Sequence, residues 1–254
     1  MADPAIEFTE VGYRIADGRA LISGVNLAVR SGETLVLVGR SGSGKTTALK
    51  LINRLLNPTS GEVKVDSTAV SAWDVIKLRR HIGYAIQDVG LFPHYTVREN
   101  VALVPKIEQW DQAKINARVD EVLELVGLPG SEYAERYPHE LSGGQRQRVG
   151  IARALAADAP ILLMDEPFGA LDPITRAEVR LQFHQLQQRL RKTVVFVTHD
   201  IGEALLLANR IGLMESGRLR GVYSPQEFVS STDEGAQAYM KVFRSGQEMF
   251  RSSS

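Results

Sequence analysis

The stretch that decides the fold is Thr34-Leu35-Val36-Leu37-Val38, followed directly by Gly39-Arg40-Ser41-Gly42-Ser43-Gly44-Lys45-Thr46. The first five residues are apolar throughout, as expected of a strand that is buried on both faces. The next eight fit the pattern G-x-x-x-x-G-K-[ST], whose glycines let successive backbone N–H groups wrap the phosphates of a nucleotide. In such a loop Lys45 neutralises the phosphates and the Thr46 hydroxyl reaches Mg²⁺. We therefore expect a phosphate-binding loop between this strand and a helix over residues 45–56.

Length and composition fit one large domain, or a domain with an inserted lobe. The chain has 254 residues, 44% of them hydrophobic, a formal net charge of zero and no cysteine. Zero net charge gives no electrostatic footprint for nucleic acid, and the lack of cysteine excludes disulfides and thiolate metal sites. The N-terminus lacks a secretory signal pattern, and the apolar runs are far shorter than the roughly 20 residues that cross a bilayer. We expect a soluble, cytoplasmic protein.

The order of predicted elements indicates an α/β fold with a helical insertion. Strands are expected over residues 5–8, 27–29, 34–38 and 62–65, where turn residues separate short apolar runs. From about residue 88 to 158 helical periodicity replaces them, at 111–126 and 144–157. Strands at 160–165 and 193–198 then alternate with helices at 178–191 and 203–208, the pattern of a parallel sheet. The segment after residue 228 is polar and is expected to be a frayed tail.

A pair of acids follows the apolar run Ile161-Leu162-Leu163-Met164. Ligands of open α/β sheets bind at the carboxyl ends of strands, which is where Asp165 and Glu166 fall. Asp165 is placed to hold Mg²⁺ through water, and Glu166 to polarise the water that attacks a γ-phosphate. Taken alone, the two acids fit a solvated loop equally well. A phosphate loop in the same chain favours the catalytic interpretation.

Two further polar residues follow predicted strands. His199 comes directly after the strand at 193–198, where it could contact a γ-phosphate, although a lone histidine there is more often structural or solvated. Gln87 follows an apolar run at 82–86 and could touch Mg²⁺ or the attacking water. By itself, a glutamine at a strand end is usually a surface residue.

The segment Leu141-Ser142-Gly143-Gly144-Gln145 contains no metal ligand, base or nucleophile. It has the features of a helix start, because Ser142 is a good N-cap and Gln145 completes a capping box three residues later. A helix N-terminus with two adjacent glycines offers bare N–H groups to an anion. Since residues 39–46 already form one complete phosphate loop, this second half-site implies that two chains come together.

The order of these motifs resembles that of the ATPase subunits of ABC transporters. Residues 39–46, 87, 141–145, 161–166, 170–172 and 199 are similar to the Walker A, Q-loop, signature, Walker B, D-loop and H-loop motifs of that family. The resemblance covers nearly the whole chain, from about residue 6 to 228. It implies a P-loop NTPase (RecA-like) core with an antiparallel β subdomain and an inserted α-helical subdomain. The domain would span residues 1–228, with the insertion at about 88–158, and residues 229–254 would be a short C-terminal tail.

The resemblance also implies roles for individual residues, with ATP and Mg²⁺ as cofactors. Glu166 would be the catalytic base, assisted by His199 and Gln87, and Mg²⁺ would be held by Thr46, Gln87 and Asp165. The implied nucleotide contacts are Gly39, Arg40, Ser41, Gly42, Ser43, Gly44, Lys45, Thr46 and Thr47. Two subunits of the family pair head to tail, so the ATP of one chain would be met in trans by Ser142, Gly143, Gly144 and Gln145 of the other, with Asp172 also at the interface.

The adenine contact departs from the family pattern. An aromatic residue usually stacks on the base, and its expected position here is occupied by Ile15, while the nearest aromatic residue is Tyr13. Adenine would pack on either of these two side chains. A lost stack would lower nucleotide affinity or loosen base selectivity.

The segment 87–97, with residues 104–105, 110–111 and 137–141, is most similar to the glycine betaine/carnitine/choline importers. Such an ATPase subunit would couple hydrolysis to solute uptake, on the inner face of the membrane, with transmembrane permease subunits and, indirectly, an extracytoplasmic solute-binding protein. CBS domains often follow the ATPase in this subfamily, and none is expected here. An importer of another small solute stays an alternative.

Two other classes fit less well. An ABC ATPase acting on nucleic acid or ribosomes would carry a coiled-coil insertion, tandem cassettes or a basic arm, so no nucleic-acid partner is expected. A P-loop kinase would leave residues 141–145 and the helical insertion unexplained.

Overall fold

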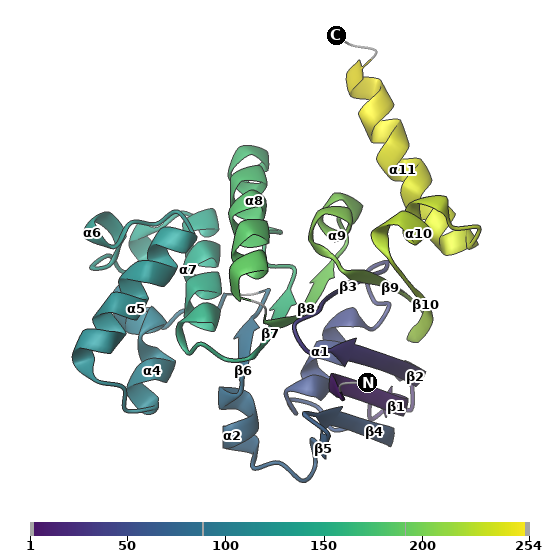
Figure 1. Ribbon diagram of the computed structural model, residues 1–254, viewed down its shortest axis with the longest axis horizontal. Helices are drawn as coiled ribbons and strands as arrows, with labels where there is room; N and C mark the ends of the chain where they lie inside the picture. Colours follow the sequence, from purple (N-terminus) through teal and green to yellow (C-terminus); the bar gives the residue numbers. More distant parts are fainter. Residues whose placement is uncertain (1–2, 88, 191, 252–254) are drawn as a thin grey trace. The chain divides into compact units, whose positions relative to one another are not determined.

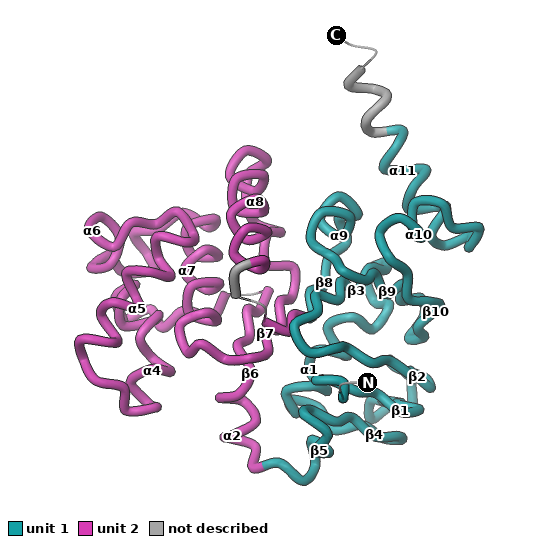
Figure 2. Tube along the Cα trace, in the orientation of Figure 1, with its two compact units in different colours: residues 1–73, 195–254 teal, residues 74–194 magenta. Residues whose placement is uncertain are grey.

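The computed structural model describes residues 3–87, 89–190 and 192–251 (Figure 1). The chain divides into two compact units (Figure 2). Unit 1 contains residues 1–73 and 195–254, and unit 2 contains residues 74–194. Unit 1 is therefore built from both ends of the chain, and unit 2 from its middle.

An antiparallel sheet forms one part of unit 1, with strand order β2-β1-β4-β5. Its strands are β1 (Pro4–Arg14), β2 (Ala20–Arg30), β4 (Ser60–Val65) and β5 (Thr68–Ala69). β1 and β2 are much longer than the apolar runs predicted at 5–8 and 27–29. The additional residues mix buried and exposed positions, and backbone pairing runs, with several register shifts, from Pro4↔Arg30 to Arg14↔Ala20. The expected antiparallel β subdomain is present.

A second sheet of unit 1 carries the phosphate loop. β3 (Thr34–Val38) is buried at every position and pairs in parallel with β9 (Arg210–Glu215), from Leu35↔Arg210 to Val38↔Leu213. β10 (Arg218–Tyr223) pairs antiparallel with β9, and β8 (Thr193–Thr198) is the neighbour of β3 on its other side. The strands predicted at 34–38 and 193–198 are confirmed to the residue. Two helices follow these strands, α1 (Lys45–Ile52) after β3 and α9 (Ile201–Leu207) after β8.

The C-terminal segment is helical, so the expectation of a frayed tail after residue 228 is wrong for the described residues. α10 (Pro225–Ser230) begins with a capping box in which Ser224 accepts from the Glu227 N–H, and proline occupies the first turn. α11 (Glu234–Arg251) is started by Asp233, whose Oδ1 accepts from the Ala236 N–H at 3.0 Å. Ala236 and Met240 are buried four residues apart. These two caps and a narrow apolar stripe are enough to order a segment whose average composition is polar.

Unit 2 is mainly helical around one pair of parallel strands. β6 (Ile82–Ala85) and β7 (Ile161–Asp165) pair in register from Ile82↔Ile161 to Ala85↔Met164. The helices are α2 (Val75–Arg80), α3 (Val97–Val101), α4 (Leu103–Ile107), α5 (Gln112–Leu125), α6 (Gly130–Tyr133), the 3₁₀ turn η1 (Pro138–Glu140), α7 (Gly143–Ala156) and α8 (Pro173–Leu190). The helices predicted at 111–126 and 144–157 correspond to α5 and α7. The end predicted for the α8 helix, residue 191, lies outside the described residues.

α7 is the central helix of unit 2. It packs against α3, α4, α5 and β6, and its side chains Val149, Ile151 and Leu155 are buried. Gly83 of β6 lies against this helix, because a Cβ at that position would collide with the Ala154 backbone oxygen. The position of α7 is thus fixed from several sides. No helix in the described part of the chain has both the length and the apolar composition to cross a membrane.

Replacing Gly83 by alanine should destabilise unit 2. The added methyl group meets the rigid backbone of α7, and overpacking of this kind costs about 1–3 kcal/mol. The unfolding midpoint, followed by circular dichroism, should fall. Gly130→Ala is the matched control, since its new methyl group would meet only the movable end of the Asp120 side chain, at 2.7 Å. Equal midpoints for the two variants would contradict the packing described for β6 and α7.

Candidate functional site

The loop after β3 is a tight turn that excludes side chains at its glycines. Gly42 and Gly44 have φ angles of +77° and +102°, in the left-handed region that favours glycine. A Cβ on Gly44 would lie 2.7 Å from the Leu21 backbone oxygen, and one on Gly39 would collide with the Met214 oxygen and the Ser43 hydroxyl. The backbone N–H groups at the start of α1 can therefore approach an anion closely.

Lys45 is folded into this loop. Its side chain is buried, and its ammonium donates to the backbone oxygens of Gly39 at 2.7 Å and Arg40 at 3.1 Å. These bonds hold the positive charge inside the turn rather than in solvent. Ser43 is also buried, and its hydroxyl has no hydrogen-bond partner among the residues that the structure describes. The loop thus presents a fixed cation and a spare hydroxyl on a frame of backbone amides.

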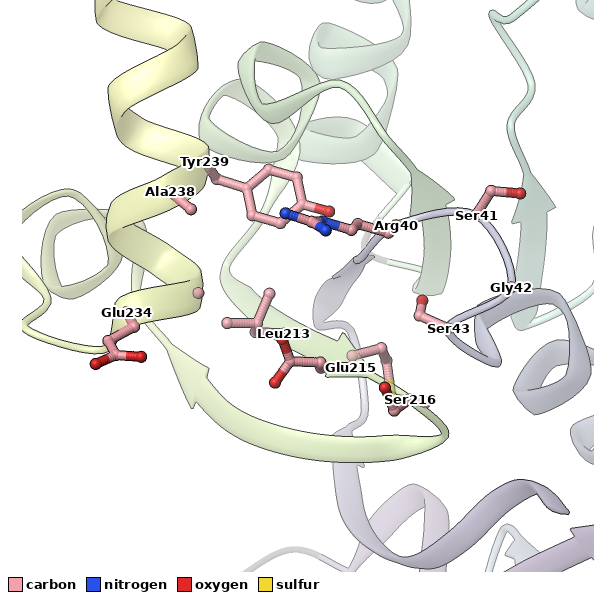
Figure 3. A pocket seen from close by; sticks show the side chains of 12 residues that line it. Arg40, Ser41, Gly42, Ser43, Leu213, Glu215, Ser216, Glu234, Ala238 and Tyr239 are labelled. Atoms are coloured by element: carbon pink, nitrogen blue, oxygen red, sulfur yellow. The ribbon is translucent and has the colours of Figure 1, made fainter.

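A pocket of about 400 Å³ flanks the loop within unit 1 (Figure 3). Residues 40–43 form one side, the β9–β10 turn another, and Glu234, Ala238 and Tyr239 of α11 a third. Burial raises the pKa of the Tyr239 phenol; the positive charge of Arg40 lowers it, while Glu215 raises it. Tyr239 of α11 therefore lies close enough to Arg40 of the phosphate loop for the charge of Arg40 to act on it.

The two candidates for the adenine contact lie at the end of β1. Tyr13 is opposite Ile22 in the β1–β2 pair, and Ile15 lies just beyond β1 in a turn closed by its N–H to the Arg19 oxygen at 3.1 Å. Both side chains are half-buried. The structure places both in unit 1 with the phosphate loop, and does not favour one over the other.

His199 is positioned by a buried hydrogen-bond network. It follows β8 directly, and its side chain is exposed. The Thr198 hydroxyl donates to the buried Glu203 carboxylate at 2.6 Å and accepts from the Asp200 N–H at 3.0 Å. Asp200 in turn caps α9 by accepting from the Gly202 and Glu203 N–H groups. The backbone on either side of His199 is therefore held in one conformation.

The predicted metal and base residues of unit 2 gather at one edge of the strand pair. Asp165 ends β7 and is buried, and Gln87 lies two residues past Ala85 at the end of β6. Because the strands are parallel and Ala85 is opposite Met164, both polar residues emerge at the same edge. Burial raises the pKa of Tyr84 on β6, and the negative charge of Asp165 raises it further. The Asp165 side chain is itself almost fully buried, with 2% exposed.

Glu166 has an unusual backbone conformation. Its φ angle is +47°, in the left-handed region, which costs a non-glycine residue about 1–2 kcal/mol. The turn is closed by the Gly169 N–H, which donates to the Glu166 backbone oxygen at 3.0 Å. Strained backbone conformations of this kind cluster at active sites, where they orient a functional side chain.

The capping box predicted at residues 142–145 is present. The Ser142 hydroxyl accepts from the Gln145 N–H at 3.2 Å, and the Gln145 side chain accepts from the Ser142 N–H at 2.8 Å. Ser142 and Gly143 are exposed, and Gly144 and Gln145 are half-buried. α7 begins at Gly143, one residue earlier than the periodicity predicted. Its N-terminus faces solvent, as an anion site at a helix start requires.

Asp172 caps α8 in the structure. Its carboxylate accepts from the Ile174 and Thr175 N–H groups, both at 3.1 Å. The hydrogen bonds from Thr175 hold the pKa of this exposed carboxyl below its usual value. The side chain predicted to face a partner chain therefore also fixes the loop that carries it.

Sequence reasoning missed two residues of α7 that bind nearby loops. Gln147 is buried and bonds to the backbone of residues 166 and 170, and Arg153 donates to the Val89 and Gly90 oxygens at 2.6 and 2.8 Å. Gln147 is among the buried residues of α7, together with Gly150, Ile151 and Ala154, whereas Arg153 is half-buried. A polar side chain inside an apolar stripe is the signal that could have identified Gln147.

The residues present fit a nucleotide with a magnesium ion. Gly39 and Gly44 lie so close to neighbouring backbone that neither position tolerates a Cβ, and within the described residues the buried Ser43 hydroxyl has no hydrogen-bond partner. No group of three or more His, Cys, Asp or Glu side chains forms a metal site of its own in the described residues. Thr46, Gln87 and Asp165 offer oxygen atoms, which Mg²⁺ prefers, and Mg²⁺ sites usually draw further ligands from substrate phosphates.

Comparison with known proteins identifies the family of the chain. The model of the family "ABC transporter" matches residues 22–169. The chain is 46% identical over 237 residues to the choline transport ATP-binding protein OpuBA of Bacillus subtilis, covering 93% of this chain and 61% of that protein. It is 49% identical over 214 residues to the glycine betaine uptake system ATP-binding protein YehX of Escherichia coli, covering 84% and 69%.

A solved structure is similar as well. It is a dimeric, post-hydrolysis state of an ATP-binding cassette bound to ADP and Pi, with 35% identity, a TM-score of 0.80 and coverage of 87% of this chain and 98% of that one. The chain belongs to the ABC transporter family, and the P-loop NTPase fold expected from the sequence is confirmed. It spans about three fifths of the length of several curated relatives that it matches.

Replacing Thr198 by valine should destabilise the turn at His199. The change removes a partner of the buried Glu203 carboxylate and of the Asp200 N–H, which costs about 1–3 kcal/mol. Thr198→Ser is the matched control, because it keeps the hydroxyl and loses one methyl group, worth about 0.8 kcal/mol. The unfolding midpoint should fall clearly further for valine than for serine. The reverse order would show that the hydroxyl network does not hold this turn.

Proposed function

We propose that this chain is the ATP-binding and hydrolysing subunit of an ABC importer for quaternary-ammonium osmoprotectants such as glycine betaine, choline or carnitine. One observation carries the ATPase assignment. The chain holds a complete phosphate loop in unit 1 and, in unit 2, a second anion-binding helix start with a strand that ends in Asp165 and Glu166. An enzyme acting on one nucleotide per chain needs the phosphate loop and the acidic strand end, and has no use for the second helix start.

Nucleotide binding would rest on the loop after β3. The backbone N–H groups at the start of α1 and the Lys45 ammonium would neutralise the β- and γ-phosphates of ATP. Arg40, Ser41, Gly42, Ser43, Thr46 and Thr47 complete the expected contacts, with Tyr13 or Ile15 against adenine. Mg²⁺, for which the family resemblance implies Thr46, Gln87 and Asp165 as ligands, would supply charge neutralisation on the phosphates. The geometry that supports this is the buried ammonium and the left-handed glycines described above.

Hydrolysis would use Glu166 as the base that polarises the attacking water. Phosphoryl transfer asks the protein mainly for positioning and charge neutralisation, so a carboxylate held at a fixed angle is sufficient. The strained backbone at Glu166 supports its role as the base. The fixed turn around His199 supports a contact of that side chain with the γ-phosphate. Gln87 would help to orient the water or the metal.

Two copies of the chain would pair head to tail. Ser142, Gly143, Gly144 and Gln145 form an exposed helix start, and a helix start binds anions through its free N–H groups and dipole. In a pair, this end of α7 would meet the γ-phosphate held by the partner chain, with Asp172 beside it. A similar cassette is dimeric in its solved structure.

A cavity in unit 2 suits a permease segment. It measures about 340 Å³ and is lined by Tyr84, Gly90, Phe92, Leu103 and Val104 with a cationic rim of Arg79, Arg80 and Arg153. Arg153 also fixes the backbone of residues 89–90, which follow Gln87. A short helix with an apolar face and acidic ends would fit this chemistry, and its movement would reach Gln87 through the chain. We infer that transmembrane partners dock here, placing the subunit on the cytoplasmic face of the membrane.

The substrate assignment rests on the relatives, whose printed names include choline and glycine betaine transport. In such importers the permease and an extracytoplasmic binding protein would select the solute. An importer of another small solute is the alternative, and the uptake experiment below separates the two.

Replacing Glu166 by glutamine should preserve ATP binding and nearly stop hydrolysis. The amide cannot accept the proton of the attacking water, and loss of a general base lowers kcat by about 10²- to 10⁴-fold. A dimer should accumulate at saturating ATP and Mg²⁺, detected by light scattering beside phosphate release. Glu178→Gln on the exposed part of α8 is the control and should behave as wild type. A Glu166→Gln chain that stays monomeric, or hydrolyses ATP at the wild-type rate, would contradict the proposal.

Uptake in the cell of origin should depend on Lys45. With the chain replaced by its Lys45→Ala variant, nucleotide binding or turnover is lost, and uptake of labelled glycine betaine, choline or carnitine at high osmolarity should fall to background. Uptake of labelled sulfate in the same cells is the control and should be unchanged. If all three osmoprotectants enter normally while the purified variant has lost its ATPase activity, the alternative of another solute is correct.

A further inference from the structure

Gln147 occupies an unusual position for a polar side chain. It lies on α7 one turn beyond Gly143, it is only 3% exposed, and it is surrounded by the packed face of the helix. A buried amide costs free energy unless both of its ends are hydrogen-bonded. Its partners therefore indicate what the side chain is for.

Both ends of the Gln147 amide bind the loop that follows β7. Its Nε2 donates to the Glu166 backbone oxygen at 3.1 Å, and its Oε1 accepts from the Ala170 N–H at 2.9 Å. An amide can donate at one end and accept at the other in this way, whereas an ionised carboxylate can only accept. One side chain thus spans the turn that begins at Glu166.

This turn connects two parts of the proposed site. It starts at Glu166, with its left-handed backbone, and leads to Asp172, which caps α8. On its other side Arg176 of α8 donates to the Gly169 and Leu171 oxygens at 3.2 and 2.9 Å. Gly144 touches it as well, since a Cβ there would lie 3.1 Å from the Leu171 side chain. The loop 166–172 is therefore held between α7 and α8, and Gln147 is its bond to α7.

We propose that Gln147 is a positioning residue that links the two nucleotide sites of the dimer. The proposal rests on the proposed function, in which the start of α7 binds the partner's nucleotide while Glu166 acts on the nucleotide of its own chain. Binding at the exposed end of α7 fixes this helix, and Gln147 transmits the position of α7 to the Glu166 turn and to the D-loop. ATP in one site thereby sets the geometry of hydrolysis in the other.

Gln147→Glu and Gln147→Leu test this link in the full-length chain. Glutamate keeps the acceptor for Ala170 and loses the donor to Glu166, while leucine loses both bonds. A base displaced by about 1 Å lowers the rate by about 100-fold, so kcat should fall by about 10- to 100-fold in both variants. The KM for ATP should stay within about twofold because the phosphate loop is untouched, and any positive cooperativity in ATP should be lost.

A readout independent of turnover completes the test. Hydrogen exchange at the Ala170 amide, measured without nucleotide, should be faster in Gln147→Leu, which loses the acceptor, and close to wild type in Gln147→Glu, which keeps it. Gln182→Glu, on the exposed face of α8, is the control and should leave kcat, cooperativity and exchange unchanged. If Gln147→Leu does not fold, Gln147→Glu carries the comparison.

The outcomes separate this inference from the function on which it rests. A wild-type chain without ATPase activity would refute the proposed function, and unchanged Ala170 exchange would then refute the link as well. An active wild type with Gln147 variants that keep kcat and cooperativity would overturn the link alone. If the variants lose stability and kcat together and their KM for ATP rises, Gln147 has a merely structural role. That outcome would also overturn the link.

Discussion

The two hydrogen bonds from the Lys45 ammonium to the backbone oxygens of its own loop hold the turn at which β3, β9 and α1 of unit 1 meet. They close this turn, in which Gly39 and Gly44 permit no side chain, and the same turn binds the β9–β10 connection through the Gly217 N–H and the Ser43 oxygen at 3.1 Å. Burying an ammonium ion costs free energy unless oxygen atoms accept its hydrogen bonds. The loop must therefore keep the shape that brings its backbone oxygens to the Lys45 ammonium.

In unit 2, the loops that carry the proposed site residues are held by side chains that form hydrogen bonds with the backbone. Asp172 fixes the start of α8, Arg176 and Gln147 hold the loop between the strand and that helix, and Arg153 holds residues 89–90. Loops of this kind are irregular in sequence and cannot form ladders of their own. Each therefore depends on a long polar side chain from a helix that is itself anchored in the core.

The parts of the fold that could be predicted are those in which one local signal dominates. The strands at 34–38 and 193–198 were found to the residue, because each is a continuous apolar run buried on every side. β1 and β2 were predicted too short, since their ends are stabilised by pairing with each other rather than by composition. α10 and α11 were missed because their order comes from the caps Ser224 and Asp233, which a reading of average polarity overlooks.

The same distinction applies to the site. Motifs in which each residue acts through its own chemistry, such as Lys45 or Glu166, are visible in the sequence. Residues that act through another residue's backbone, such as Gln147, depend on which segments fold against each other, and one sequence does not contain that information. The role of Asp172 as a helix cap was likewise invisible until Pro173 was known to begin a helix.

The capping box at Ser142 restricts which residue can occupy that position. The hydroxyl oxygen already accepts from the Gln145 N–H, and the hydroxyl proton is the one group left to point outward. Aspartate would cap the helix as well but would bring a negative charge to the place where a phosphate is expected, and alanine would neither cap nor donate. Serine satisfies the helix with a lone pair of its oxygen and would still have its proton for an anion, so one hydroxyl group would serve both folding and recognition.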